Sequence, residues 1–141
     1  MGLRVTRREQ DGISILLLKG RLTIGPEDLQ LNDEIQHALV TRKVRVVIDL
    51  GGVDKMDSAG LGALLSARAE LQRSGGGLAL ANLNSTHMKT LLVAKLDTVF
   101  EVFDSELDAI NSFFPDRHVP HSDLLAVVAS LRQAHALRQA S

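Results

Sequence analysis

Residues 44–62, VRVVIDLGGVDKMDSAGLG, decide the fold of this chain. The stretch begins with a nearly continuous run of Val and Ile, which is typical of a central strand buried on both faces. Asp49 and Leu50 end that predicted strand, because the Gly51-Gly52 pair interrupts it. A helix is predicted to begin at Ser58, whose hydroxyl is expected to cap the free N–H groups of the first turn. The stretch therefore predicts a strand, an acidic loop and a helix in succession.

Two glycines, Gly60 and Gly62, lie in the first turn of this predicted helix. Each costs about 1 kcal/mol relative to alanine inside a helix, so a helix start without Cβ atoms needs a reason. We expect that another part of the backbone approaches the helix closely at this place.

The segments on either side of this stretch predict further strands and helices. On the N-terminal side, strands over 3–7 and 13–18 form a hairpin at Asp11-Gly12, and the turn-rich residues 20–26 lead into a helix. On the C-terminal side the pattern predicts, in order, a strand over 78–83, a short helix from Asn84, a strand over 99–103 and a short helix through 109–113. Such alternation favours parallel pairing with right-handed crossovers, so we expect Ile48 and Leu80 to be buried on adjacent parallel strands.

The last part of the chain, residues 115–141, predicts a linker and an extra helix. Pro115 and Pro120 bracket a short polar linker, and Ser122 is expected to cap a final amphipathic helix whose apolar stripe runs from Leu124 to Ala134. An isolated helix of this size is marginal in water. We therefore expect the stripe to lie either on its own domain or against a second copy in a homodimer.

Composition limits the function classes. The 141 residues, 45% of them hydrophobic, fit one compact domain with an appendage. The formal net charge of -1 provides no bulk attraction for nucleic acid or an anionic membrane, and Phe is the only aromatic residue that could stack on bases. Because the chain has no Cys, no apolar run of membrane-spanning length and no secretion signal at its start, we expect a cytoplasmic protein.

No set of side chains predicts catalysis. Ser58 lacks the G-x-S-x-G elbow, and no histidine with an orienting carboxylate is evident, which argues against a hydrolase. Asp49, Asp54 and Asp57 could in principle hold Mg²⁺, but Lys55 and the usual solvent exposure of loop carboxylates favour no metal site. From the residues alone, Ser58 is interpreted as a helix cap and nothing more.

The same residues resemble a known family. Asp49-Leu50, Val53, Met56 and DSAGLG at 57–62 are similar to the core signature of STAS domains, in particular bacterial anti-sigma factor antagonists. The resemblance covers Leu3 to Phe114 and includes, in the same order, Gly20-Arg21-Leu22, the Gly75-Gly76-Gly77 break, the LALANL strand and the segment KLDTVFEVFDSELDAI. It implies an α/β fold for residues 3–114, a STAS-like mixed β-sheet with helices mainly on one side. The linker and C-terminal amphipathic helix of 115–141 are additional to it.

The resemblance also implies a function without catalysis. In these antagonists the serine at the place of Ser58 accepts a phosphate, which a helix N-terminus tolerates. The implied partner is an anti-sigma factor that is also a serine kinase of the histidine-kinase-like ATPase class, and a phosphatase would reverse the modification. ATP and Mg²⁺ would belong to that kinase, so no cofactor is expected on this chain. The residues expected to bind the partner are Thr23, Met56, Asp57, Ser58, Ala59, Gly60, Leu61 and Gly62.

Three positions depart from the family pattern. Thr23 stands where many antagonists have an acidic residue, and Lys55 stands where an aromatic or aliphatic residue is common. Ala59 replaces a common second serine or threonine, which leaves Ser58 as the sole acceptor in the motif. Two other functions therefore stay open, a STAS regulatory subunit of a lipid-transport ABC ATPase and a scaffold of a stress complex.

Overall fold

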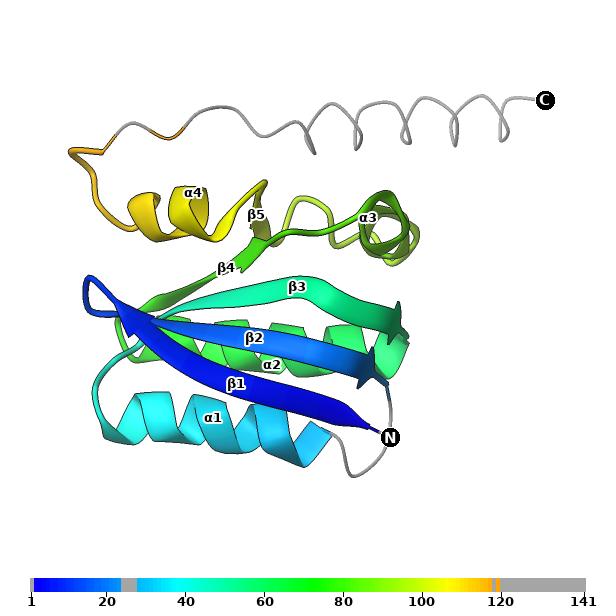
Figure 1. Ribbon diagram of the computed structural model, residues 1–141, viewed down its shortest axis with the longest axis horizontal. Coiled ribbons are helices and arrows are strands. Elements are labelled where there is room, and N and C mark those ends of the chain that lie inside the picture. The colour runs from blue at the N-terminus through cyan, green and yellow to red at the C-terminus, as the bar shows by residue number, and fades with distance from the viewer. Residues whose placement is uncertain (1, 24–27, 118, 120–141) are drawn as a thin grey trace.

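The computed structural model describes residues 2–23, 28–117 and 119, which form one sheet covered by helices (Figure 1). The strands are β1 (Leu3–Gln10), β2 (Ile13–Leu22), β3 (Arg45–Met56), β4 (Gly77–Ala81) and β5 (Glu101–Phe103), and the helices are α1 (Asp28–Val40), α2 (Ser58–Arg73), α3 (Ser85–Val93) and α4 (Glu106–Asn111).

The five strands lie in the order β1-β2-β3-β4-β5. β1 and β2 form the predicted antiparallel hairpin, while β2, β3, β4 and β5 pair in parallel, which makes the sheet mixed. Ile48 of β3 is paired with Leu80 of β4, and both side chains are fully buried. The predicted central strand and its parallel neighbour are therefore confirmed.

The helices divide unequally between the two faces of the sheet. α1 and α2 lie side by side on one face, and the larger hydrophobic core joins them to the sheet through residues such as Leu31 and Leu64 (Figure 1). Met88 and Leu91 of α3 belong to the same core. On the other face, α4 covers a smaller core with Ile110. The expectation of helices mainly on one side is confirmed.

The two central strands are longer than predicted. β3 continues through Gly51-Gly52 to Met56, and β2 continues to Leu22, because the two strands keep pairing across two register shifts. A Cβ atom on Gly52 would lie 2.8 Å from Cγ of Lys19, so this glycine permits close approach of β2 instead of ending the strand. The prediction that Gly51-Gly52 breaks the strand was wrong.

Other predicted boundaries differ by a few residues. β4 and β5 are shorter than the predicted strands, and α4 ends before Phe113. The predicted helix start at Asn84 is confirmed as an N-cap, and Ser105 caps α4. Pro26, Pro120 and the predicted C-terminal helix from Ser122 to Ala134 lie outside the described residues.

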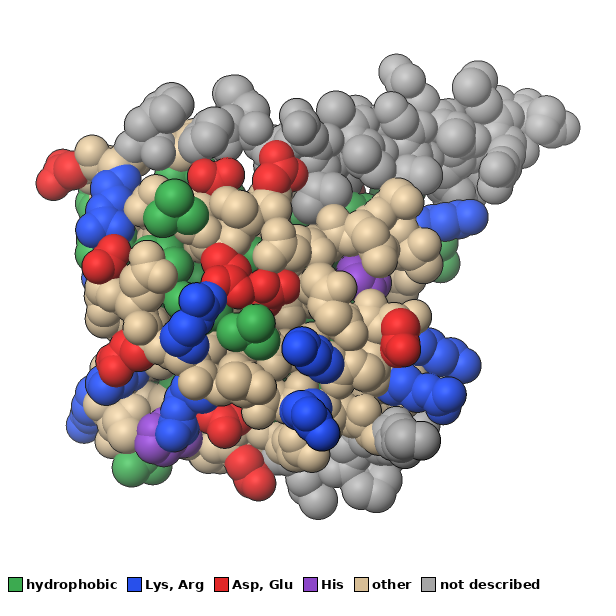
Figure 2. All heavy atoms as spheres, viewed as in Figure 1, with side chains coloured by type: hydrophobic (Ala, Val, Ile, Leu, Met, Phe, Trp, Pro, Cys, Tyr) green, Lys and Arg blue, Asp and Glu red, His purple; other side chains and the backbone are tan. Residues whose placement is uncertain are grey.

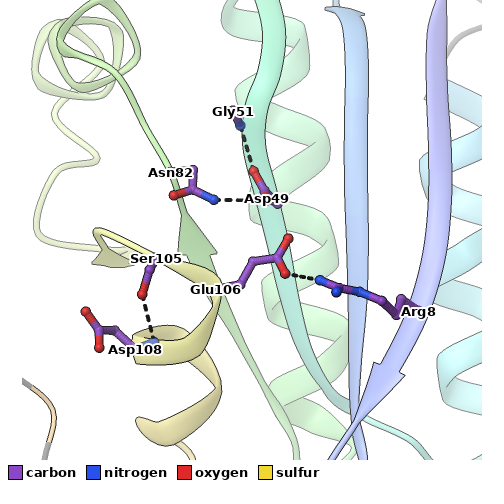
Figure 3. Close-up of polar contacts among 7 residues, drawn as sticks. All are labelled: Arg8, Asp49, Gly51, Asn82, Ser105, Glu106 and Asp108. Atoms are coloured by element: carbon purple, nitrogen blue, oxygen red, sulfur yellow. Dashed lines mark hydrogen bonds and ion pairs between the residues drawn. The ribbon is translucent and has the colours of Figure 1, made fainter.

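A polar cluster links α4 to the sheet. Asp49 of β3 accepts hydrogen bonds from the backbone N–H of Gly51 at 2.8 Å and from the amide of Asn82 at 2.9 Å (Figure 3). Glu106, in the first turn of α4, lies against Asp49 and forms an ion pair with Arg8 of β1. Acidic side chains accordingly gather in the middle of this face of the molecule, with basic side chains beside them (Figure 2). The cluster connects four segments that are remote in sequence, namely β1, β3, the end of β4 and α4.

The neighbouring carboxyls of Asp49 and Glu106 shift each other's pKa in opposite directions. Burial by itself would raise the pKa of Asp49, but hydrogen bonds from Glu106, Gly51 and Asn82, with the charge of Arg8, lower it below the usual range. The hydrogen bond with Asp49, followed by burial, raises the pKa of Glu106, and Arg8 opposes this only in part. As the pH falls, Glu106 therefore takes up a proton before Asp49 does.

The opposite pKa shifts of Glu106 and Asp49 predict a pH effect on folding. Since the folded pKa of Glu106 is raised, its contribution to stability is fully present below the usual glutamate pKa and is lost as the pH rises through the folded value. The contribution of Asp49 to stability depends on pH in the opposite direction. Because its folded pKa is lowered, that contribution is present above the usual aspartate pKa and is lost as the pH falls through the folded value. Acidification from neutral pH should therefore stabilise wild type relative to Glu106→Gln, until Asp49 is protonated.

Urea unfolding at a series of pH values measures this difference. Asp54→Asn, which removes an exposed carboxyl outside the cluster, serves as the control and should follow the wild-type profile. A constant difference in free energy of unfolding between wild type and Glu106→Gln across the acidic range would contradict the raised pKa of Glu106.

Candidate functional site

The C-terminal end of β2 meets the beginning of α2. The backbone N–H of Asp57 donates to the carbonyl oxygen of Leu22 at 3.3 Å. One carboxylate oxygen of Asp57 then accepts from the backbone N–H of Gly60 at 2.9 Å, and the Asp57 carbonyl accepts from the N–H of Leu61 at 3.0 Å. Asp57 therefore ties the helix start to the end of the neighbouring strand.

The N-cap of α2 is Asp57, so the prediction that Ser58 caps this helix was wrong. Aspartate and serine are both strong capping residues, and the two stand next to each other in the sequence. The structure selects Asp57 because its extended backbone places the side chain over the first turn. Ser58 becomes the first residue of α2, with an exposed side chain.

The two glycines of the first turns have different roles. A Cβ atom on Gly60 would overlap the carbonyl oxygen of Leu22, so the predicted close approach of another backbone is confirmed at this position. At Gly62 a Cβ atom would have no neighbour within 4 Å, and the same prediction was wrong there. Gly60 thus allows the seating of α2 on β2.

The residues predicted to bind a partner come together at this end of the sheet. Thr23 directly follows the strand residue that receives the Asp57 hydrogen bond, so its bend lies beside the start of α2. The exposed members of the set are Ser58 and Gly62; the half-buried ones are Thr23, Met56, Asp57 and Ala59; the buried ones are Gly60 and Leu61. Only part of the predicted set is therefore open to direct contact with a partner. Gly60 is buried and contributes by allowing α2 to pack closely on β2.

An apolar groove of about 460 Å³ begins at Ser58 and runs between α2 and α3. Its lining residues are Ser58, Leu61, Thr86, Lys89, Thr90, Val93 and Ala94. Val93 is 69% exposed and gives the groove an apolar side chain on its α3 wall. Sequence reasoning missed this groove; the signal was that apolar residues of α3 extend beyond the stripe that includes Met88 and Leu91.

A buried histidine fixes the helix that forms the second wall of this groove. Nε2 of His87 lies 2.8 Å from the carbonyl oxygen of Val53, and Nδ1 accepts from the backbone N–H of Asn84. Both bonds are satisfied by the neutral tautomer that carries its proton on Nε2. Asn84 returns a bond by accepting from the His87 N–H at 2.8 Å, which completes a capping box. Sequence analysis assigned His87 no role, whereas in the structure its buried side chain anchors α3 to β3.

The described residues contain no group of three or more acidic or histidine side chains placed to hold a metal ion, so Asp49, Asp54 and Asp57 do not converge. Asp49 instead belongs to the polar cluster with α4, and Asp57 caps α2. In the same part of the chain, no helix has the length and apolar character needed to cross a bilayer.

The sequence model of the STAS domain family matches residues 4–109, about three quarters of the chain. The chain belongs to the STAS domain family. The resemblance drawn from DSAGLG and its flanking segments is thereby confirmed, together with the fold that it implied.

Named relatives of this STAS domain are anti-sigma factor antagonists. The anti-sigma F factor antagonist of Paenibacillus polymyxa is 26% identical over 113 residues, which cover 78% of this chain and 94% of the relative. An anti-sigma factor antagonist from Mycobacterium paratuberculosis has the same fold, with a TM-score of 0.68 at 20% identity over 79% of this chain and 93% of that one. The Bacillus cell fate determinant SpoIIAA, solved in its phosphorylated form, gives a TM-score of 0.61 at 20% identity over 78% and 99% of the two chains. These relatives are regulatory proteins and not enzymes.

The contrast between the two glycines predicts opposite effects of the same substitution. Gly60→Ala should lower the free energy of unfolding by about 2 kcal/mol or more, because the new methyl group meets the Leu22 carbonyl in a place that cannot expand freely. Gly62→Ala should raise it by up to about 1 kcal/mol, since alanine is the better helix former and space is open. Thermal and urea unfolding of both variants measure this; equal effects would show that β2 does not restrict the start of α2.

Proposed function

We propose that this STAS domain protein is a cytoplasmic anti-sigma factor antagonist that phosphorylation of Ser58 switches off. Its unphosphorylated form binds an anti-sigma factor that is also a serine kinase of the histidine-kinase-like ATPase class, so that a sigma factor is freed for transcription. The kinase brings its own ATP and Mg²⁺, and a phosphatase restores the active form. The observation that carries the proposal is the exposed hydroxyl of Ser58, which is spared from capping and lies at the mouth of an apolar groove.

The helix start explains how Ser58 can carry a phosphate without unfolding the domain. The N-terminus of a helix has a partial positive charge, which partly offsets the negative charge of a phosphate there. Asp57 supplies the cap through its own side chain, so phosphorylation of Ser58 leaves that bond in place. The modification should therefore act on binding more than on folding.

The groove explains why a phosphate would prevent binding. A phosphate adds a charge of about −1.5 to −2 at neutral pH and is strongly hydrated. Val93 provides an exposed apolar surface for a partner side chain, and a hydrated dianion at Ser58 would have to lose water when that partner docks. Lys89 lines the same groove and would be drawn toward the phosphate, away from any acidic group on the partner.

Two variants of Ser58 separate stability from binding. Ser58→Ala should change the free energy of unfolding by less than about 0.5 kcal/mol, because Asp57 holds the cap, and should bind the partner kinase without being phosphorylated. Ser58→Asp should fold equally well, since acidic residues suit a first helical turn, and should bind poorly. Intact-mass spectrometry after incubation with the cognate kinase and ATP, and a binding titration, measure these outcomes.

Ser66→Asp is the matched control, because Ser66 is also exposed and lies two turns further along α2. It should bind like wild type. A wild-type protein that gains no phosphate, together with full binding by Ser58→Asp, would reject the switch and favour a STAS subunit that docks without modification.

Substitutions of two highly exposed valines, Val93 and Val40, test whether the groove contacts the partner. Val93→Asp should weaken binding to the kinase by at least about tenfold, because it places a charge where an apolar contact is expected. Val40→Asp is the control, since Val40 is 80% exposed at the end of α1 and does not line the groove. Neither change should lower the melting temperature measurably. Equal affinity of both variants would exclude the groove from the interface.

A further inference from the structure

A second concave site lies at the opposite end of the sheet from Ser58. β3 and β4 are parallel and begin at Arg45 and Gly77, whereas the start of α2 follows the end of β3. Beside these strand beginnings is a trough of about 530 Å³, bounded by the C-terminal half of α2, the Gly75–Gly77 loop and the turn before β5. The side chains that matter for its chemistry are Arg45, Arg68, Gln72, Thr98, Glu101 and Phe113.

The two arginines of this trough have no partner among the residues that the structure describes. Neither guanidinium makes a hydrogen bond or an ion pair there, although Arg68 is half-buried on α2. Elsewhere on the domain, Arg7 and Arg117 each contact a carboxylate at 3.1 Å. Arg68 is partly withdrawn from water and keeps five N–H donors to satisfy, whereas Arg45 is exposed. Both residues line the same cavity, so two guanidinium groups without a described ion-pair partner lie beside it.

The glycine loop makes room for the trough but supplies no donors to it. A Cβ atom on Gly76 would overlap the carbonyl oxygen of Val44, so the loop lies directly against the residue that precedes β3. The N–H groups of Gly75, Gly76 and Gly77 are all used, by the carbonyls of Gln72, Leu71 and Val44. A ligand in the trough would consequently be held by side chains and not by the backbone.

We propose that this trough binds a small oxyanion, a molecule that carries phosphate or several carboxylates, through Arg45 and Arg68. The planar fork of arginine matches both kinds of group and can hold either in bidentate fashion. Gln72 lies one helical turn beyond Arg68 and lines the same cavity, and the Thr98 hydroxyl adds a further donor from the opposite wall. The volume lies within the range of small-molecule sites, and the concave shape favours a small molecule over a protein surface.

One acidic residue sets the strength of the site. Glu101, at the start of β5, lines the trough and is too far from either arginine to pair with it. Its charge repels an anion, so the site should hold its ligand with moderate affinity. Replacing Glu101 with Gln should tighten binding of the oxyanion, so the proposal predicts a variant with higher affinity than wild type.

Calorimetric titration of the full chain, in a buffer of low salt free of phosphate, tests the site with inorganic pyrophosphate and with citrate as the two probes. We expect one saturable site for at least one probe, weakened about tenfold or more by Arg45→Gln or Arg68→Gln. Glu101→Gln should bind several-fold more tightly. Arg73→Gln is the matched control, because Arg73 is exposed on the same helix outside the trough, and it should bind like wild type.

The pattern across probes and variants decides the proposal. Tighter binding of pyrophosphate assigns the site to phosphate-bearing molecules, and tighter binding of citrate assigns it to polycarboxylates. The proposal is overturned if neither probe saturates up to about 10 mM, or if Arg73→Gln weakens binding as much as the trough variants do. The second result would mean general attraction to positive charge. Thermal melts of each variant confirm that the domain is folded, and binding of the oxyanion is measured without the kinase, so a failed Ser58 switch leaves this result unaffected.

Discussion

The close approach of the end of β2 to the first turn of α2 is the constraint on which the candidate site depends. The Leu22 carbonyl receives the Asp57 N–H and leaves no room for a side chain at Gly60. Because Asp57 also caps the helix, one residue fixes both the direction of α2 and its distance from the sheet. The exposed hydroxyl of Ser58 and the groove between α2 and α3 are consequences of that seating.

Periodicity and the DSAGLG signature predicted the order of elements and the parallel pairing of Ile48 with Leu80. They failed where a decision depends on neighbours that are distant in sequence. By sequence, Gly52 indicates a strand break, and only the contact with Lys19 shows that it permits close pairing of two strands. Gly60 and Gly62 have the same local pattern, and only the position of Leu22 distinguishes their roles. Asp57 and Ser58 are both good caps by type, so only backbone geometry chooses between them.

The groove and the histidine anchor were missed for a related reason. His87 attracted no assignment in the sequence, because its partner is the Val53 carbonyl, 34 residues earlier in the chain. Val93 is recognised as part of a groove only from the positions of α3 and α2 in the fold, since an exposed valine in a short helix says little by itself. Long-range pairs of this kind shape the candidate site, and single-sequence patterns do not record them.

A serine held at the first position of a packed helix has a consequence for any enzyme that modifies it. Flexible acceptor segments adapt to a catalytic cleft and lose conformational entropy as they do so, whereas Ser58 is already ordered by Asp57 and the strand behind it. An enzyme acting on such a residue must fit a folded surface and gains selectivity from its shape. A linear peptide with the same residues would lack that shape and would be a poor substrate. A paralogue that carries the same short motif on a helix packed differently against its sheet would also be a poor substrate.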